Sequence, residues 1–485
     1  MKKMEGRASK ILVVVVLAIA GWTCGLGGQA AWAGVFQWTW IRGASTRYQS
    51  GTYGTIGIPA AANTPGARSG AVSWTDGSGA LYLFGGGGED GAGASGHFND
   101  LWKYDPSSGN WTWMKGASTR DQFGTYGTRG TPAAANTPGA RSGAVSWTDG
   151  SGALYLFGGG GEDGAGALGH LNDLWKYDPS SGNWTWMKGA STRDQFGTYG
   201  TRGTPASGNT PSARSGAVSW TDGPGALYLF GGWGFVDTPD YGELNDLWKY
   251  DPSTGNWTWM KGASTVNQWG IYGTRGTPAA DNTPGARGGA VSWTGGSGAL
   301  YLFGGAGWDG AGVSGHFNDL WKYDPSTGNW TWMKGASTVD QPGTYGTLGT
   351  PAADNTPGAR YSAVSWTDGS GALYLFGGYG CDGEGAVGYL NDLWKYDPST
   401  GNWTWIKGAS TRRQSGTYGM IGIPAADNTP GARSDAVSWT DGSGALYLFG
   451  GGGCDGAGDG GFLNDLWRGQ VPTVQTAAKD WTLYE

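Results

Sequence analysis

Carboxylate side chains recur at one position of this 485-residue sequence, where they could bind a metal ion. Carboxylates and loop carbonyls are the ligands that Ca²⁺ prefers. The surrounding segments, such as GGGGEDGAG at 85–93, lack the large apolar residue and the nine-residue tandem of the calcium nonapeptide. We therefore predict Ca²⁺ only if several carboxylates converge, and solvated loop residues otherwise. We expect no other cofactor. The five aspartates, interrupted once by Val236, are Asp90, Asp163, Asp309, Asp382 and Asp455.

Aromatic side chains gather in one segment whose counterparts are glycine, alanine and acid. Residues 231–246 read GGWGFVDTPDYGELND, whereas the equivalent residues 85–100 read GGGGEDGAGASGHFND. Aromatic residues clustered on exposed loops suit sugar stacking or protein contact, although they also fill gaps between neighbouring loops. We predict that a ligand-binding surface contains Trp233, Phe235, Tyr241, Glu243, Trp269 and Trp308.

These residues lie within a repeat of 73 residues. An arginine and the phenylalanine of each LYLFGG segment keep this step throughout, with no insertion or deletion, which gives six copies of one unit. The arginines are Arg68, Arg141, Arg214, Arg287, Arg360 and Arg433. Because they recur in every copy, we expect them to hold strands and turns together.

Each unit contains four strand signals. In the first unit these are 71–74 (AVSW), 80–84 (ALYLF), 101–104 (LWKY) and 111–114 (WTWM), separated by turns rich in Asp and Gly. The high glycine and aromatic content also disfavours a helical protein. Four antiparallel strands repeated six times predict an all-β, six-bladed propeller.

The two ends of the repeat region predict how the ring closes. The sixth unit loses its fourth strand after Gly469, and the missing strand occurs at the other end as QWTWIRGAS (37–45). Trp38 lies one repeat before Trp111. We therefore predict that the N-terminal strand completes the last blade.

Strand alternation also predicts the location of the long connections. In a four-stranded antiparallel blade, the connection between blades and the connection between the second and third strands leave on the same face. Binding residues concentrate on such loops. We therefore expect ligand binding on this long-loop face.

The motifs resemble those of kelch-repeat β-propellers. LYLFGG followed by Tyr104 and Trp111 is similar to the kelch motif, and the resemblance covers the mature chain about six times over. The family includes oxidases, epimerases and many protein-binding scaffolds, so the resemblance implies a fold more strongly than a function.

The resemblance to the galactose oxidase propeller raises the question of a copper site. His97, His170 and His316 share one repeated position, so different blades hold them apart unless they lie near the axis, and we expect no copper there. Cys381 and Cys454 also share a position on neighbouring units. Their disulfide, which we carry as a prediction, requires both to lie almost on the axis.

The N-terminus predicts export. Positive charge, the apolar run ILVVVVLAIA and AWA at 31–33 resemble a signal peptide of residues 1–33, cleaved before Gly34. The propeller then spans 34–469, and 470–485 form a tail. We expect a periplasmic, cell-surface or secreted monomer without a membrane span. The net charge of −7 offers no basic patch for nucleic acid.

Three functions are compatible with this pattern. The first is a non-catalytic scaffold that binds a protein or glycan on the long-loop face, which the near-identity of the first two units favours. The second is a carbohydrate-active enzyme that uses Glu243 or Glu384 with Arg129 or Arg202. The third is a structural cell-surface repeat protein. The sequence therefore leaves catalysis open but favours a binding role.

Overall fold

The structure is a computed structural model that describes residues 36–470, except 77–78, 223–224, 296–297 and 369–370. Its regular elements in these ranges are all β-strands, and no helix there is long and apolar enough to cross a membrane. The predicted signal peptide and all but the first residue of the predicted tail lie outside the described residues.

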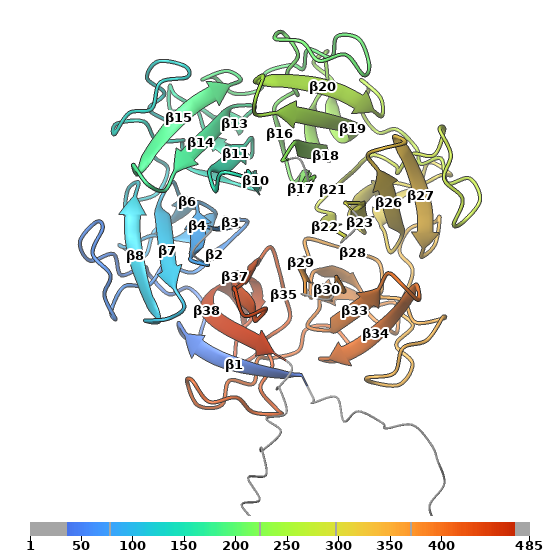
Figure 1. Ribbon diagram of the computed structural model, residues 1–485. Coiled ribbons are helices and arrows are strands. Elements are labelled where there is room, and N and C mark those ends of the chain that lie inside the picture. The colour runs from blue at the N-terminus through green and yellow to red at the C-terminus, as the bar shows by residue number, and fades with distance from the viewer. Residues whose placement is uncertain (1–35, 77–78, 223–224, 296–297, 369–370, 471–485) are drawn as a thin grey trace, which may run out of the picture.

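The predicted β-propeller of four-stranded antiparallel blades is confirmed (Figure 1). The first blade has the order β3 (Val72–Thr75), β4 (Leu81–Phe84), β7 (Leu101–Asp105) and β8 (Asn110–Lys115). Each strand lies within one or two residues of its predicted range. Five further sheets of this kind occur in the described residues. They contain β10 (Val145–Thr148), β11 (Leu154–Phe157), β14 (Leu174–Asp178) and β15 (Asn183–Lys188); β17 (Val218–Thr221), β18 (Leu227–Phe235), β19 (Tyr241–Asp251) and β20 (Asn256–Lys261); β22 (Val291–Thr294), β23 (Leu300–Phe303), β26 (Leu320–Asp324) and β27 (Asn329–Lys334); β29 (Val364–Thr367), β30 (Leu373–Phe376), β33 (Leu393–Asp397) and β34 (Asn402–Lys407); and β36 (Val437–Thr440), β37 (Leu446–Cys454), β38 (Gly460–Gln470) and β1 (Gln37–Arg42).

The N-terminal strand closes the ring as predicted. Strand β1 pairs antiparallel with β38, with Trp38 opposite Gly469 and Trp40 opposite Trp467. In Figure 1, blue β1 lies beside red β38, which joins the two ends of the repeat region without a covalent bond. The sixth sheet therefore depends on a strand from the start of the chain.

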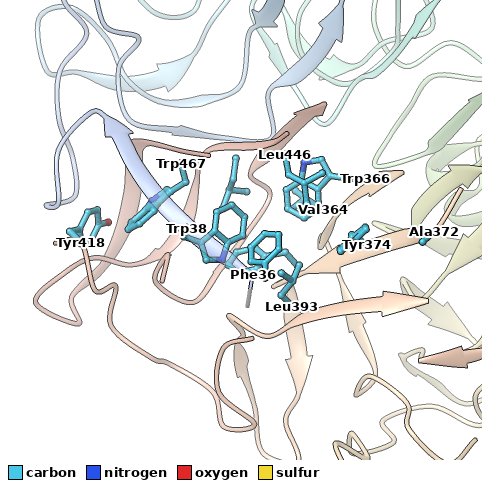
Figure 2. Packing of buried hydrophobic residues seen from close by; sticks show 12 residues of the cluster. Phe36, Trp38, Val364, Trp366, Ala372, Tyr374, Leu393, Tyr418, Leu446 and Trp467 are labelled. Carbon is cyan, nitrogen blue, oxygen red and sulfur yellow. The ribbon is translucent and has the colours of Figure 1, made fainter. Parts of the chain in front are cut away.

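The core lies between neighbouring blades. One cluster combines Trp366 and Phe376 of the fifth sheet with Leu448 and Trp467 of the sixth, and Trp38 packs among them with no exposed surface (Figure 2). Five equivalent clusters occur between the other neighbouring sheets in the described residues. Each blade is therefore stabilised by its neighbours, so an open ring would expose apolar surface.

The glycine-rich loops form hairpins, which the sequence analysis did not predict. In the first unit, β2 (Arg68–Ser69), β5 (Gly87–Glu89) and β6 (Ser95–His97) make a small accessory sheet beyond the double glycine. Gly85 has a φ of +69°, and a Cβ there would lie 2.7 Å from the Arg141 carbonyl oxygen. LYLFGG therefore needs glycine at this point because the next blade approaches so closely. The corresponding strands of other units are β9 (Arg141–Ser142), β12 (Gly160–Glu162) and β13 (Leu168–His170); β16 (Arg214–Ser215), which pairs with β18; β21 (Arg287–Gly288), β24 (Ala306–Trp308) and β25 (Ser314–His316); β28 (Arg360–Tyr361), β31 (Tyr379–Cys381) and β32 (Val387–Tyr389); and β35 (Arg433–Ser434), which pairs with β37.

A buried ion pair connects each accessory sheet to its blade. The guanidinium of Arg68 donates to both carboxylate oxygens of Asp100, at 2.7 and 2.8 Å, and Tyr53 and Trp102 each donate to the same carboxylate at 2.7 Å. Neither charged side chain is more than 1% exposed. The repeated arginines therefore have the structural role that the sequence indicated. The equivalent pairs are Arg141–Asp173, Arg214–Asp246, Arg287–Asp319, Arg360–Asp392 and Arg433–Asp465.

The connection between blades covers two surfaces, so the prediction that both long connections lie wholly on one face needs correction. Its first part contacts the hairpin of the following blade, since Gly124 N donates to Asp163 O. Its later part follows that blade's outer strand, where Gly130 N donates to Trp186 O. This pairing satisfies backbone groups of an edge strand that would otherwise be open to another chain.

Candidate functional site

The five aspartates of the predicted calcium site are buried parts of the hairpins and do not converge. In the first hairpin, Asp90 Oδ1 accepts from Ala92 N and Ala94 N at 2.8 and 2.9 Å, and Oδ2 accepts from Arg120 N at 3.3 Å. Burial opposes ionisation of Asp90, but these amide donors hold its pKa below the usual range. The prediction that these aspartates are solvated loop residues is therefore wrong. In each of the others, Oδ1 accepts the amides two and four residues on; these are Asp163, Asp309, Asp382 and Asp455.

The predicted disulfide is wrong. Cys381 and Cys454 are both free and buried. Cys381 is the last residue of β31, and Cys454 is the last residue of β37 in the neighbouring unit. Burial, and then the charge of nearby Asp340, raises the pKa of the Cys381 thiol to about 11, so this thiol is protonated at neutral pH.

The three histidines remain on separate blades, as expected. His170 lies beside Tyr241, whose hydroxyl is 3.3 Å from the imidazole Nε2. His316 instead lies beside Asp340 and Cys381, and their ligand atoms are all within 4.8 Å of one another. This His–Asp–Cys group brings His316 and Cys381, which were predicted to have separate roles, together with Asp340, which the sequence did not single out.

The axis of the propeller contains a cavity of about 530 Å³, lined by the Ser-Trp-Thr residues of the six innermost strands. The serine hydroxyls are occupied: Ser146 Oγ, for example, donates to the Ser73 carbonyl oxygen at 3.0 Å. Six backbone N–H groups, one from each unit, also form a closed ring in which each donates to the carbonyl of the equivalent residue in the preceding unit. The ring residues are Gly70, Gly143, Gly216, Gly289, Ser362 and Asp435.

The aromatic residues of segment 231–246 have different roles. The Trp233 indole is half-buried across the blade boundary, where a Cβ at Gly288 would lie 2.5 Å from it. Glu243 accepts a hydrogen bond from Trp308 Nε1 at 3.1 Å. These three residues of the predicted ligand surface are therefore engaged in packing between the third and fourth blades.

Phe235 and Tyr241 of the same segment belong to a different cluster. The Phe235 ring is half-buried, with its centroid 5.9 Å from Phe196 and 5.3 Å from Tyr241. The Tyr241 side chain is 50% exposed. Tyr241 therefore lies at the edge of this cluster, with a surface open to a ligand.

Exposed aromatic residues occupy one repeated position in three consecutive units. Phe123, Phe196 and Trp269 are 60%, 48% and 58% exposed. The other units have Ser50, Pro342 and Ser415 there. The predicted ligand surface includes Trp269 but neither phenylalanine, although both share its position in the repeat.

Exposed apolar side chains of the adjacent hairpins enlarge the apolar surface that Phe123, Phe196 and Trp269 form. Leu168 is 58% exposed, and Val313 is 52% exposed. Backbone bonds join the connections to these hairpins, as from Gly270 N to Asp309 O. We call this surface the apolar arc, which comprises Phe123, Leu168, Phe196, Tyr241, Trp269 and Val313.

The residues of the enzymatic alternative lie apart. The guanidiniums of Arg129 and Arg202 each stack 4.4 Å from an outer-strand tryptophan ring, and each donates to a carbonyl there. Glu384 lies exposed in the fifth hairpin, whereas Glu243 contacts Trp308. The described residues therefore do not bring these acids and arginines into one site.

A second exposed apolar group lies beside the outer strands of the first and sixth blades. Gly57 N and Gly422 N donate to the carbonyls of Trp113 and Trp40, which fixes the neighbouring residues at the outer edge. We call this group the outer-rim cluster. It comprises Ile56, Ile58, Met420, Ile421 and Ile423, each more than half exposed.

Comparisons with known proteins agree with this architecture. The KLHDC2/KLHL20/DRC7 Kelch-repeats domain matches residues 132–347, and the Kelch motif matches residues 361–408. A search of curated proteins gave no match. The two family matches cover more than half of the chain and fall on the repeated four-stranded sheets. The chain therefore belongs to the kelch-repeat proteins.

Proposed function

We propose that this kelch-repeat protein is a non-catalytic scaffold that binds a partner protein on the apolar arc. Kelch repeats in general suggest protein interaction. The observation that carries the proposal is the exposed aromatic ring at one position of three consecutive units, where the other three have serine or proline. Large exposed apolar patches on soluble proteins mark interaction surfaces.

Rings of the apolar arc pack against the backbone of adjacent hairpins, so they are already positioned before a partner binds. A Cβ at Gly312 would lie 2.4 Å from the Trp269 indole, so the hairpin backbone supports this ring directly. Phe123 covers Gly166 in the same way in the second unit. Side chains that are already fixed lose less conformational entropy when a partner binds.

The composition of the arc favours a protein over a glycan. Leu168 and Val313 add aliphatic surface beside the rings. Aromatic anchors surrounded by apolar contacts are typical of the energetic centre of protein interfaces.

Replacing the three rings is expected to abolish partner binding. The variant Phe123→Ser/Phe196→Ser/Trp269→Ser should lose partners captured by the wild-type chain, with Kd raised more than about 100-fold because each interface anchor contributes about 2 kcal/mol or more. Pull-down identifies the partner, and calorimetry measures its affinity for both proteins.

A matched control carries Ile56→Ser/Ile421→Ser/Ile423→Ser in the outer-rim cluster. It should retain the wild-type Kd. Loss of binding only in this outer-rim variant would overturn the proposal, as would capture of a glycan in place of a protein by the wild-type arc. Both variants alter side chains that are about half exposed or more, so melting curves like that of wild type are expected.

We further propose that the chain is exported as a monomer after cleavage behind Ala33. The charged and apolar segments of residues 1–33 support this proposal. Mass spectrometry of the protein from the periplasm or the medium should give a chain that begins at Gly34, and light scattering should give one copy. Retention of the intact N-terminus in the cytoplasm would contradict export.

A further inference from the structure

Three side chains with different metal-binding groups meet at the boundary between the fourth and fifth blades. His316 ends β25, Asp340 lies in the connection that follows the fourth blade, and Cys381 ends β31. Their ligand atoms all lie within 4.8 Å of one another. It is the one group of three or more such residues in the described part of the chain that meets this distance.

The backbone fixes the geometry of this group. Asp340 N donates to His316 O at 2.8 Å, and His316 N donates to Asp340 Oδ1 at 2.9 Å. Gly315 leaves room for the carboxylate, since a Cβ there would lie 2.5 Å from Asp340 Oδ2. The Asp340 carboxylate is therefore held against the His316 backbone without a metal.

Two of the ligand atoms lack other hydrogen bonds in the described structure. The buried His316 Nδ1 lies 2.9 Å from Asp340 Oδ1, but the pair does not have hydrogen-bond geometry. The Cys381 side chain is 1% exposed and forms no disulfide. A buried nitrogen and a buried thiol beside a carboxylate are groups that a cation would satisfy.

The equivalent boundaries show that this combination is specific to one place. At the first boundary, His97, Asp121 and Glu162 occupy the same positions, but Arg120 forms an ion pair with Asp121. At the fourth boundary Val339 replaces that arginine, so Asp340 has no adjacent cation. The other equivalent sets are His170, Asp194 and Phe235; Glu243, Asn267 and Trp308; Tyr389, Arg413 and Cys454; and Phe462, Tyr48 and Glu89.

We propose that His316, Asp340 and Cys381 bind one Zn²⁺ ion. Imidazole nitrogen, carboxylate oxygen and thiolate sulfur are the donors that Zn²⁺ takes in proteins, at about 2.0–2.3 Å. Such bond lengths bring tetrahedral ligand atoms to about 3–4 Å from one another. Here all three lie within 4.8 Å of one another, and His316 Nδ1 is 2.9 Å from Asp340 Oδ1. Small side-chain rotations would bring the three ligand atoms to these bond lengths from one ion.

The fourth zinc position is open toward solvent. The Asp340 side chain is 50% exposed, whereas the Cys381 side chain is buried. Tyr361 stacks on the His316 ring at 5.3 Å and 15°, which limits rotation of the imidazole. Three protein ligands and one open position leave room for water or for a donor from a bound molecule. The ion would also join the accessory sheets of two blades.

Zinc binding is tested on the full chain with Zn²⁺ and Co²⁺. Competition with a chromophoric chelator should give one high-affinity Zn²⁺ per chain, and Co²⁺ should give a thiolate-to-metal absorption band. His316→Gln should weaken Zn²⁺ by more than about 100-fold, because loss of an outer partner alone costs about 10–100-fold. Cys381→Ser should remove the band.

Control variants separate this site from other thiols and from misfolding. Cys454→Ser should retain both the band and the affinity. Cys381→Glu copies Glu162 of the second unit, so it should fold while losing the band. Val339→Arg should weaken Zn²⁺ by pairing with Asp340, as Arg120 pairs with Asp121. A thiolate band that persists in folded Cys381→Glu, or wild-type affinity in His316→Gln, overturns the proposal.

Discussion

Replacing Asp173 with Asn is expected to lower the free energy of unfolding by about 3–5 kcal/mol, because it leaves the Arg141 guanidinium buried without its counter-ion. Both side chains have no exposed surface, and Tyr126 and Trp175 also donate to this carboxylate. Asparagine keeps the size of the side chain but offers a neutral acceptor to Arg141. Denaturant unfolding measures the loss.

Two comparisons distinguish loss of charge from loss of shape. Asp178→Asn, in an exposed turn where Ser180 and Ser181 donate to the carboxylate, should cost about 1 kcal/mol or less. The double variant Arg141→Met/Asp173→Leu removes both charges and should recover much of the stability. An Asp173→Asn protein as stable as the Asp178→Asn protein would contradict the proposed role of the ion pair.

Removing the closing strand is expected to lower the thermal midpoint sharply. Residues 34–42 include β1, whose Trp38 packs 5.6 Å from Phe376 and 6.2 Å from Trp366 across the blade boundary. Trp38→Ala alone should cost about 3–5 kcal/mol, as for other buried aromatic residues. Asn428 also loses its hydrogen bond to the Trp38 carbonyl when the strand is deleted. Calorimetry measures the midpoint.

A peptide added in trans provides the control for this deletion. A peptide of residues 34–46 should restore the midpoint of the shortened chain in a concentration-dependent way, because it binds the native form. The same peptide with Trp38→Ser should restore much less. An unchanged midpoint after deletion would show that the ring does not depend on this strand.

The fold was predictable because every unit repeats the same signals without a change of register. Leu81 to Phe84 are apolar and buried on both faces, as the run ALYLF indicated. Trp38 identified the closing strand because it keeps the repeat spacing. Local pattern was therefore sufficient wherever the interaction partner lay in the same or an equivalent unit.

The accessory sheets were not predictable from local pattern. Glycine and alanine disfavour strands, so 85–93 resembled a loop. The hairpin forms because the Asp90 carboxylate accepts hydrogen bonds from two amides of its own turn. Carbonyl groups of neighbouring segments accept hydrogen bonds from other backbone amides of the hairpin. The residue types do not show that these aspartates are buried, because their hydrogen-bond partners are backbone groups.

The candidate sites depended on contacts between units. His316, Asp340 and Cys381 come from three segments of two neighbouring units, so their proximity depends on how the blades pack together. Cys381 lies near Asp340 and Arg360, whereas Cys454 lies near Arg413 and Arg433, and both thiols are free. The apolar arc was accessible to sequence analysis, since Phe123 and Phe196 share the position of Trp269, but exposure separates it from the packed Trp233 and Trp308.

The most direct test of the binding role is hydrogen exchange of the wild-type chain with and without its captured partner. The account predicts protection at 117–124, 163–170, 190–197, 236–244, 263–270 and 309–316, the connections and hairpins that present the apolar arc. Protection confined to 52–60 and 417–425, beside the outer-rim cluster, would contradict it.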